Sequence, residues 1–243
     1  MSLRQRISTA QGKQQYVRAL FATIADRYDF ITRFLSYGQD ARWKRRLIRL
    51  AGLRPDDRVL DLACGTGDLA FAAAPHVRQA IGLDVTFRMV QLARRRTRDA
   101  SVSFLTGDML ALPFPDRSVD VVTTGYGLRN VPDLDRALAE IARVLRPQGR
   151  LLSLDFNRPA NPIVRGAYLA YLTAVGSTLG FALHGDPDTY RYIPASIRLY
   201  PGAHKVADMM RAHGFASARV IPVLGGLMAI HVAARGRDGG TTQ

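Results

Sequence analysis

The chain has 243 residues, of which 47% are hydrophobic, and this predicts one α/β domain with a sizeable core. Its single cysteine, Cys64, excludes a disulfide framework and favours a reducing compartment. Lysine and arginine number 34 against 20 acidic residues, a net charge of +14. This excess favours an anionic partner such as nucleic acid or a membrane surface, although an arginine- and alanine-rich proteome would give the same bias. The basic N-terminus lacks the continuous apolar core of a secretory signal, so none is expected.

Strands and helices alternate through the first half of the chain. Buried-type apolar runs predict strands, and amphipathic runs between them predict helices. The expected elements are strands at 57–63, 79–84 and 102–106 and helices at 68–74 and 86–97, the second helix with Thr86 as N-cap. Because parallel strands need helical crossovers, this alternation predicts a parallel sheet with helices on both faces.

The alternation continues toward the C-terminus, where two consecutive strands replace the strand–helix order. The expected elements are strands at 119–124, 149–156, 218–224 and 227–234 and helices at 134–145 and 203–213. Gly225 and Gly226 separate the last two strands and predict a hairpin, so one strand should run antiparallel. The fold class is therefore α/β, with a doubly wound and mostly parallel sheet, and residues 237–243 are expected to be a disordered tail.

One apolar segment has the composition of a membrane span. Residues 166–183 carry no charge for 18 residues, which is the lower limit for crossing a bilayer. The segment also contains three glycines, two threonines and a serine. A helix buried in the protein, or lying over an apolar ligand, is the favoured interpretation.

The stretch "RVLDLACGTGDLA", residues 58–70, places an acid and two glycines where the first strand ends. In a doubly wound sheet, ligands bind beyond the carboxyl ends of the strands, and Gly65-Thr66-Gly67 offers bare backbone there. The pattern lacks the third glycine of a dinucleotide fingerprint and the Gly-Lys-Ser/Thr of a phosphate loop. Asp61 would repel a pyrophosphate but would attract an ammonium group.

Two further strand ends complete the expected cofactor site. Asp84 ends the second strand, at the place where an acid accepts the ribose hydroxyls. Asp108 and Met109 follow the third strand, where the acid would accept the adenine amino group and the thioether would pack on the ring. A ligand with an amino-acid end and a ribose but no phosphate is S-adenosylmethionine, so this cofactor is predicted.

Several motifs resemble a known family over most of the chain, about residues 21–234. They are "FATIADRYDF", "LSYGQDARWKR", "LALPFPDRSVDVV", "YGLRNVPDLDRAL", "RVLRPQGRLLSLDFNRP", "GDPDTYRYIPASIRLYP" and "GGLMAIH". The chain resembles the ubiquinone/menaquinone biosynthesis C-methyltransferases, which are class I S-adenosylmethionine-dependent methyltransferases. "GLRNV" and "YRYIPASI" favour this family because they are not general methyltransferase motifs.

The resemblance implies an architecture and a set of cofactor contacts. It implies a seven-stranded sheet, an N-terminal helical cap at 1–52, a methyltransferase domain at 53–236 and a lid inserted at 157–201. It implies cofactor contacts at Thr66, Asp84 and the Asp108-Met109 pair, with Tyr28 of the cap within reach and Gly125 near the cofactor.

The chain departs from the family at several positions. Thr32 replaces the usual asparagine of Tyr-Asp-x-Met-Asn, and Asp40 replaces a usual histidine. Gln148 and Asn157 replace a glycine and a serine, and Gly125 stands where serine is common. These departures leave the substrate open and allow a paralogue that methylates another aromatic ring.

Methyl transfer to an aromatic carbon needs the loss of a phenolic proton and a group that stabilises the phenolate. By placement and by family motif, Arg129 is expected to stabilise the phenolate and Asn130 to orient the ring. A role of both in the turn before the next helix is the alternative. The proton acceptor stays open between Asp155, Asp186, His184 and His231, of which Asp186 is favoured.

The expected substrate is a prenylated quinol, either demethylmenaquinol or a ubiquinol precursor, in respiratory quinone biosynthesis. The aromatic residues of the insertion would suit such a ring and tail, although they are equally typical of core packing. The protein is expected in the cytoplasm, in peripheral contact with an anionic membrane, with a homodimer left open and no nucleic-acid partner. No metal site is expected, since the five histidines lack ligand spacing. RNA methylation and non-catalytic binding of the cofactor or of a lipid are the alternatives.

Overall fold

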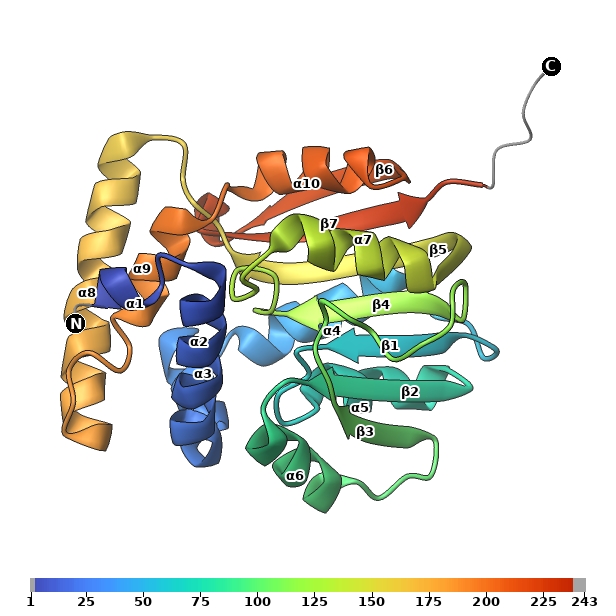
Figure 1. The fold of residues 1–243 in the computed structure, drawn as a ribbon, viewed down its shortest axis with the longest axis horizontal. Coiled ribbons are helices and arrows are strands. Elements are labelled where there is room, and N and C mark those ends of the chain that lie inside the picture. The colour runs from blue at the N-terminus through green and yellow to red at the C-terminus, as the bar shows by residue number, and fades with distance from the viewer. Residues whose placement is uncertain (1–2, 238–243) are drawn as a thin grey trace.

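The computed structural model describes residues 3–237, and a seven-stranded sheet runs through its centre (Figure 1). The strands are β1 (Arg58–Leu62), β2 (Gln79–Asp84), β3 (Val102–Thr106), β4 (Val119–Gly125), β5 (Leu145–Phe156), β6 (Phe215–Val223) and β7 (Met228–Arg235). Their order is β3-β2-β1-β4-β5-β7-β6. Only β7 runs against its neighbours, pairing antiparallel with β5 and β6. The predicted doubly wound, mostly parallel sheet with one antiparallel strand is confirmed.

Helices cover both faces of the sheet. The helices that follow the strands are α5 (Asp68–Ala73), α6 (Phe87–Arg96), α7 (Leu134–Val144) and α10 (Ala203–Ala212), and α4 (Asp40–Ala51) precedes β1. Leu60 and Leu62 of β1 pack in a core cluster with α7 and α10, whereas Val59 packs on the other face with α4 and α5. Because both faces are buried, the strand reads as a nearly continuous apolar run.

Asp61 interrupts that run. It lies between Leu60 and Leu62, and its side chain is only 1% exposed. A buried acid among apolar strand residues is costly unless it has partners, so this position is a marker for the site.

Two strands begin earlier than the sequence predicted. β5 starts at Leu145 rather than 149, because Leu145 already pairs with Val119 across an irregularity in the register. β6 starts at Phe215 rather than 218, and its register with β7 shifts between Phe215 and Ser217. Local turn residues predicted loops at both places, but pairing with the neighbouring strand extends the ladder through them.

The remaining helices gather beyond the carboxyl ends of the parallel strands (Figure 1). They are α1 (Leu3–Arg6), α2 (Ala10–Ile24) and α3 (Tyr28–Leu35) near the N-terminus, and α8 (Pro162–His184) and α9 (Tyr192–Leu199) in the insertion. Tyr190, in the loop after α8, and Tyr192, the first residue of α9, pack against residues of α2 and α3 in two small clusters. Two segments far apart in the sequence therefore close over the same edge of the sheet.

Helix α8 contains the uncharged segment. Within the described residues it is the one helix long and apolar enough to cross a membrane, and 28% of its most apolar window is buried. Tyr168, Leu169 and Leu172 face the protein, while Ile163 and Phe181 are exposed. The helix is thus only partly buried, less than the sequence led us to expect. The predicted disordered tail falls, apart from Arg237, outside the described residues.

Candidate functional site

Three cavities meet beyond the ends of β1, β2 and β4. The largest, the aromatic cavity, has a volume of about 410 Å³ and is lined by residues of α2, α3, α8 and α9 with Trp43, Tyr126, Arg129 and Asn130. The loop cavity is lined by the ends of β2, β3 and β4 and by Gly65. The polar cavity is lined by Lys44, Asp61, Thr66, Asp68 and their neighbours. Tyr28 and Tyr126 line all three.

The loop cavity brings together most of the expected cofactor residues. The expected members that line it are Tyr28, Gly65, Asp84, Asp108, Met109 and Gly125. The carboxylate of Asp84 accepts hydrogen bonds from the backbone N–H of Gly65 at 2.9 Å and of Thr86 at 2.8 Å. Asp84 therefore also fixes the glycine loop against the end of β2.

Bare backbone borders this cavity where the sequence has glycine. A Cβ atom on Gly127 would come within 2.3 Å of the Thr124 hydroxyl and 2.9 Å of the Ala63 side chain. Gly65 has a φ of +54°, a conformation that favours glycine. Gly127 is therefore required by close packing against Thr124 and Ala63, and Gly65 by the left-handed turn of the loop.

Gly67 is surrounded differently from Gly65. It lines none of the three cavities, and a Cβ on it would lie within 2.7 Å of the Phe104 ring. The residue precedes α5 with a φ of 93°, so it makes the turn and packs against Phe104. Gly67 thus has a structural role in this turn, and its contact with the cofactor remains a prediction.

Asp61 lies in the polar cavity with one oxygen unused. Its Oδ1 accepts a hydrogen bond from the Thr123 hydroxyl at 2.9 Å, whereas Oδ2 is buried and has no partner. Burial raises the pKa of Asp61 to about 7, opposed by the Thr123 hydrogen bond, by the charge of Lys44 and by the nearby backbone N–H of Ala70. An uncompensated buried carboxylate is strongly unfavourable, so this site favours a bound cation.

Thr66 also lines the polar cavity. Its hydroxyl donates to Asp29 Oδ1 at 2.6 Å, and its carbonyl accepts a hydrogen bond from Arg96. The glycine loop is in this way tied to α3 and α6. The residues present thus fit S-adenosylmethionine: an unpartnered acid suits the ammonium group, and a glycine-lined cavity with Met109 suits the nucleoside.

Helix α2 covers the loop cavity. The side-chain amide of Gln14 donates to Asp108 Oδ2 at 2.6 Å, and Val17 and Phe21 line the cavity. The Lys13 ammonium donates to the carbonyl oxygens of Arg129 and Val131 at 3.0 and 2.6 Å. Burial, with a smaller contribution from Arg129, lowers the pKa of Lys13 to about 8.

Arg129 and Asn130 both line the aromatic cavity. The Arg129 guanidinium donates to Asp155 Oδ1 at 2.6 Å and to the Ser196 hydroxyl at 2.8 Å. The Asn130 amide nitrogen donates to the Tyr126 carbonyl at 2.7 Å, which leaves its buried Oδ1 without a partner. Phe21, Tyr28, Tyr126 and Asn130 line both the aromatic and the loop cavities, so ligands of the two would meet beside them.

The four candidate proton acceptors do not line the aromatic cavity. Asp186 lies in the loop after α8, where it accepts hydrogen bonds from Asp188 N and the Thr189 hydroxyl, and it lines a separate cavity with Arg6 and Tyr16. The structure therefore places Asp186, the favoured proton acceptor, outside the cavity that Arg129 and Asn130 line, and its catalytic role remains a prediction.

The other three candidates are engaged elsewhere. Asp155 is paired with Arg129, and His184 hydrogen-bonds the Tyr190 hydroxyl. Both ring nitrogens of buried His231 are engaged, with Ser153 and with the Ala203 carbonyl. Within the described residues there is also no cluster of three histidine, cysteine or acidic side chains that could hold a metal ion.

Two residues of the site were missed from the sequence. Tyr126 has a φ of 63°, which is uncommon for a tyrosine, and its buried hydroxyl donates to Asp40 at 2.6 Å. Lys44 lies next to it in the polar cavity. Unusual backbone conformations are concentrated at functional sites, which fits a place for Tyr126 in the site. In the sequence, the available signal for Tyr126 was its position in the "YGLRNV" motif.

Comparisons with known proteins agree with this geometry. The model of the ubiE/COQ5 methyltransferase family matches residues 9–235. The chain belongs to this family. A ubiquinone/menaquinone biosynthesis C-methyltransferase of Teredinibacter turnerae is 39% identical over 91% of this chain and 92% of its own length. A demethylmenaquinone methyltransferase of Thermus thermophilus is 41% identical over 89% of this chain and 100% of its own length.

A solved structure supports the fold. The S-adenosylmethionine-dependent methyltransferase of Thermotoga maritima superposes with a TM-score of 0.66 at 20% identity, over 90% of this chain and 99% of that one. The ubiE/COQ5 member described here is therefore an S-adenosylmethionine-dependent C-methyltransferase with a class I fold. The family resemblance, the enzyme class and the cofactor predicted from the sequence are confirmed, whereas the individual site residues remain predictions.

Proposed function

We propose that this enzyme methylates a ring carbon of a prenylated quinol, such as demethylmenaquinol or a ubiquinol precursor, in quinone biosynthesis. The observation that carries the proposal is the aromatic cavity. Its walls include ten aromatic residues, among them Trp43, Phe156 and Tyr168, and it shares Tyr126 with the loop cavity. A flat apolar ring fits such walls and would lie against the cofactor there. The names of the relatives give the same class of substrate.

The residues at the junction would position the ring. S-adenosylmethionine supplies an activated methyl group on its sulfonium, so the protein mainly has to orient the acceptor. The unpartnered Oδ1 of Asn130 would accept a hydrogen bond from one ring hydroxyl. Arg129, which lines the same cavity, would lend positive charge as the phenolate forms, while Asp155 and Ser196 hold the guanidinium in one orientation.

The prenyl tail would leave through a groove between α3 and α8. The groove is lined by Phe30, Phe34, Tyr37, Tyr171 and neighbouring residues, and it shares Leu35, Tyr37 and Tyr171 with the aromatic cavity. The hydroxyl groups of Tyr37 and Tyr171 hydrogen-bond to each other across it. A long apolar tail would follow this groove from the ring site toward the outer surface of α8, and it would displace the Tyr37–Tyr171 hydrogen bond.

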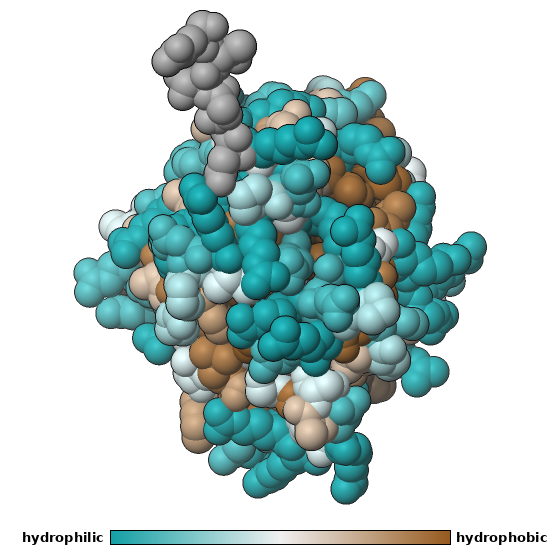
Figure 2. Space-filling model, turned by 90° about the vertical axis from the view of Figure 1, so that its right-hand side faces the viewer, coloured by the Kyte–Doolittle hydropathy of each residue, from teal (hydrophilic) through white to brown (hydrophobic). Residues whose placement is uncertain are grey.

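That outer surface would rest on the membrane. We define the α3–α8 surface by the exposed residues Phe30, Phe34, Tyr37, Ile163, Val164, Tyr171 and Phe181. So many exposed large apolar side chains on two neighbouring elements are unusual on a protein surrounded by water, and a net charge of +14 favours anionic lipid. Figure 2 shows the right-hand side of Figure 1, away from α8, and that side is mainly hydrophilic with some apolar areas. We therefore place the enzyme at the cytoplasmic face of the membrane.

Label transfer tests the proposed substrate. The purified enzyme should transfer label from methyl-labelled S-adenosylmethionine to demethylmenaquinol or to a demethyl ubiquinol precursor, each supplied in phospholipid vesicles. A quinol that already carries the methyl group is the control and should take up no label. Absence of label in both precursors would reject the quinol and leave another aromatic acceptor.

A further inference from the structure

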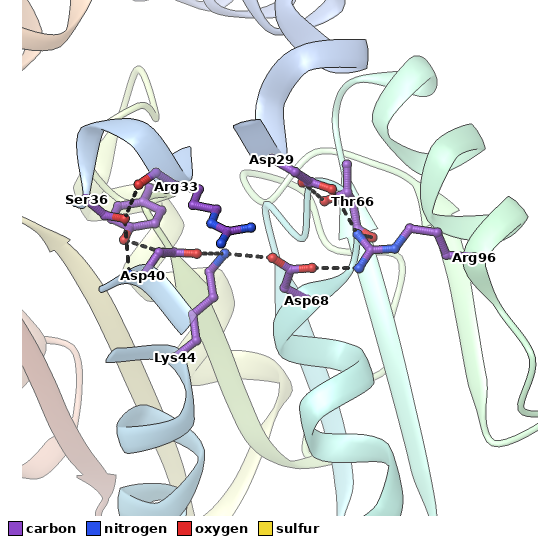
Figure 3. Close-up of polar contacts among 9 residues, drawn as sticks. Asp29, Arg33, Ser36, Asp40, Lys44, Thr66, Asp68 and Arg96 are labelled. Carbon is purple, nitrogen blue, oxygen red and sulfur yellow. Dashed lines mark hydrogen bonds and ion pairs between the residues drawn. The ribbon is translucent and has the colours of Figure 1, made fainter. Parts of the chain in front are cut away.

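Lys44 stands in the middle of a chain of polar contacts that the proposed chemistry does not use. Its ammonium lies 2.7 Å from Asp40 Oδ2 and 3.0 Å from Asp68 Oδ2 (Figure 3). Asp68 in turn pairs with Arg96 at 3.0 Å, and Asp40 accepts the hydrogen bond of Tyr126. The chain thus runs from the wall of the aromatic cavity to the partly exposed side of α6.

The ammonium of Lys44 has a hydrogen to spare. A lysine carries three donors, and two of them are directed at Asp40 and Asp68. Its side chain is 11% exposed, and it forms part of the wall of the polar cavity. Burial opposes its charge, but Asp40, Tyr28 and Asp68 outweigh burial and raise the pKa of Lys44 above the ordinary lysine value. The residue therefore presents a permanent positive charge to this cavity.

Asp61 presents the opposite charge to the same cavity. Its unpartnered Oδ2 would accept an ammonium group, as argued above. A cavity that has a buried acid and a buried lysine in its wall is complementary to a zwitterion, which carries one charge of each sign. The amino-acid end of S-adenosylmethionine is such a zwitterion.

The arrangement of the loop and polar cavities also indicates that the amino-acid end of the cofactor would lie in the polar cavity. The loop cavity contains the acids expected to bind the ribose and the adenine, and it shares Tyr28, Ala63, Gly125 and Tyr126 with the polar cavity. A cofactor whose nucleoside occupies the first would direct its amino-acid end into the second. We propose that Lys44 binds the carboxylate of the cofactor's methionine end, opposite Asp61, which binds its ammonium group.

Asp40 and Tyr126 are positioning residues in this proposal. Their hydrogen bond, at 2.6 Å, holds Asp40 toward Lys44, and Lys44 follows Asp40 by one helical turn in α4. Asp40 and Asp68 would both repel the incoming carboxylate, but the Tyr126 hydroxyl donates to Asp40 and Arg96 pairs with Asp68, so both charges are partly compensated. Lys44 is thereby left as the cation that faces the ligand.

Affinities for three ligands distinguish the proposed Lys44 contact from the proposed Asp61 contact. S-adenosylmethionine has both charged groups, its decarboxylated analogue keeps only the ammonium, and methylthioadenosine has neither. Calorimetry should show that Lys44→Gln weakens S-adenosylmethionine binding about 10- to 150-fold, as expected for a lost charged hydrogen bond. Affinities for the other two ligands should change by less than about threefold, because neither has a carboxylate.

Asp61→Asn is the matched variant. It should weaken both S-adenosylmethionine and the decarboxylated analogue and leave methylthioadenosine unchanged, and the exposed Lys205→Gln should leave all three unchanged. An equal loss for all three ligands in Lys44→Gln would show that Lys44 only supports the fold and would overturn the proposal. Unchanged affinity for S-adenosylmethionine would overturn it too. These measurements need no methyl acceptor, so they stand apart from the proposed quinol substrate.

Discussion

Arg129 and Asp155 form a buried ion pair, with 2.6 Å between Nη1 and Oδ1 and side chains that are 4% and 2% exposed. The backbone N–H of Arg129 donates to the second Asp155 oxygen at 3.0 Å, and the guanidinium lies 4.7 Å from the centre of the Phe156 ring. The residue expected to stabilise a phenolate is thus also an anchor between β4 and β5. Its two roles need an experiment that separates them.

We expect Arg129→Ala to lower the free energy of unfolding by about 3–5 kcal/mol, because it leaves Asp155 buried without its partner. The double variant Arg129→Met with Asp155→Leu removes both charges and should recover most of that loss in denaturant unfolding. If the guanidinium assists methyl transfer, turnover of the stable double variant should still be lower by about 10²–10³-fold. Near-normal turnover in the double variant would remove Arg129 from the catalytic residues.

Asp84→Ala should weaken S-adenosylmethionine binding by about 1.5–3 kcal/mol, the value of a hydrogen bond to a charged group. The variant removes an acceptor for the ribose and also frees the Gly65 and Thr86 N–H groups that Asp84 now holds. Calorimetry measures the affinity, with Asp208→Ala, an exposed pair with Arg211, as control. An affinity equal to that of the wild type would contradict the assignment of Asp84 to the ribose.

Cofactor binding should depend on pH through Asp61, whose pKa in the folded protein is about 7. The ammonium group of S-adenosylmethionine binds the ionised carboxylate of Asp61. The affinity for S-adenosylmethionine should therefore fall by up to tenfold for each pH unit below 7 and level off above pH 7. In the absence of ligand, the free energy of unfolding depends on pH in the opposite direction. Because the pKa of Asp61 is raised in the folded state, stability is lost as pH rises through 7. Calorimetry from pH 5.5 to 8.5 should show the first dependence in the wild type and not in Asp61→Asn.

The α3–α8 surface predicts which side chains bind lipid. Phe30→Ser and Phe181→Ser should each weaken binding to anionic phospholipid vesicles about tenfold, because each removes a large apolar side chain from the contact. Phe87→Ser is the control, since Phe87 is 60% exposed but lies at the start of α6. Sedimentation velocity on the same variants reports any dimer. Vesicle binding that is insensitive to Phe30 and Phe181 would count against this surface.

The sequence predicted the sheet well because strand signals there are strong and local. Apolar runs mark β1, with Asp61 next to its end, and β2, which ends in Asp84, and the ends of these strands define the cofactor side of the molecule. Lys44 was missed because its partners Asp40 and Asp68 come from different parts of the chain, and only folding brings α4 beside α5. A signal existed, however: the chain has only three lysines among 34 basic residues, and two of them, Lys13 and Lys44, are largely withdrawn from water.

Asp186 shows a limit of local sequence pattern. Its motif "DPDTYRY" attracted attention, but the path of the loop that carries it cannot be read from local pattern. The aromatic residues after it do reach the cavity, as Tyr190 and Tyr192 show. Side-chain type was therefore informative for packing residues, whereas the position of one isolated acid needed the structure.

Helix α2 also bears on the order of events in a turnover. The same helix contacts Asp108 through Gln14 and contributes Leu20, Phe21 and Ile24 to the wall of the aromatic cavity. Helix α2 is therefore part of the wall of both binding sites, and a cofactor bound beneath it would complete the surface against which the acceptor lies. This favours an ordered kinetic scheme in which the cofactor binds first and its demethylated product leaves last. The product S-adenosylhomocysteine should then inhibit competitively against S-adenosylmethionine and noncompetitively against the methyl acceptor.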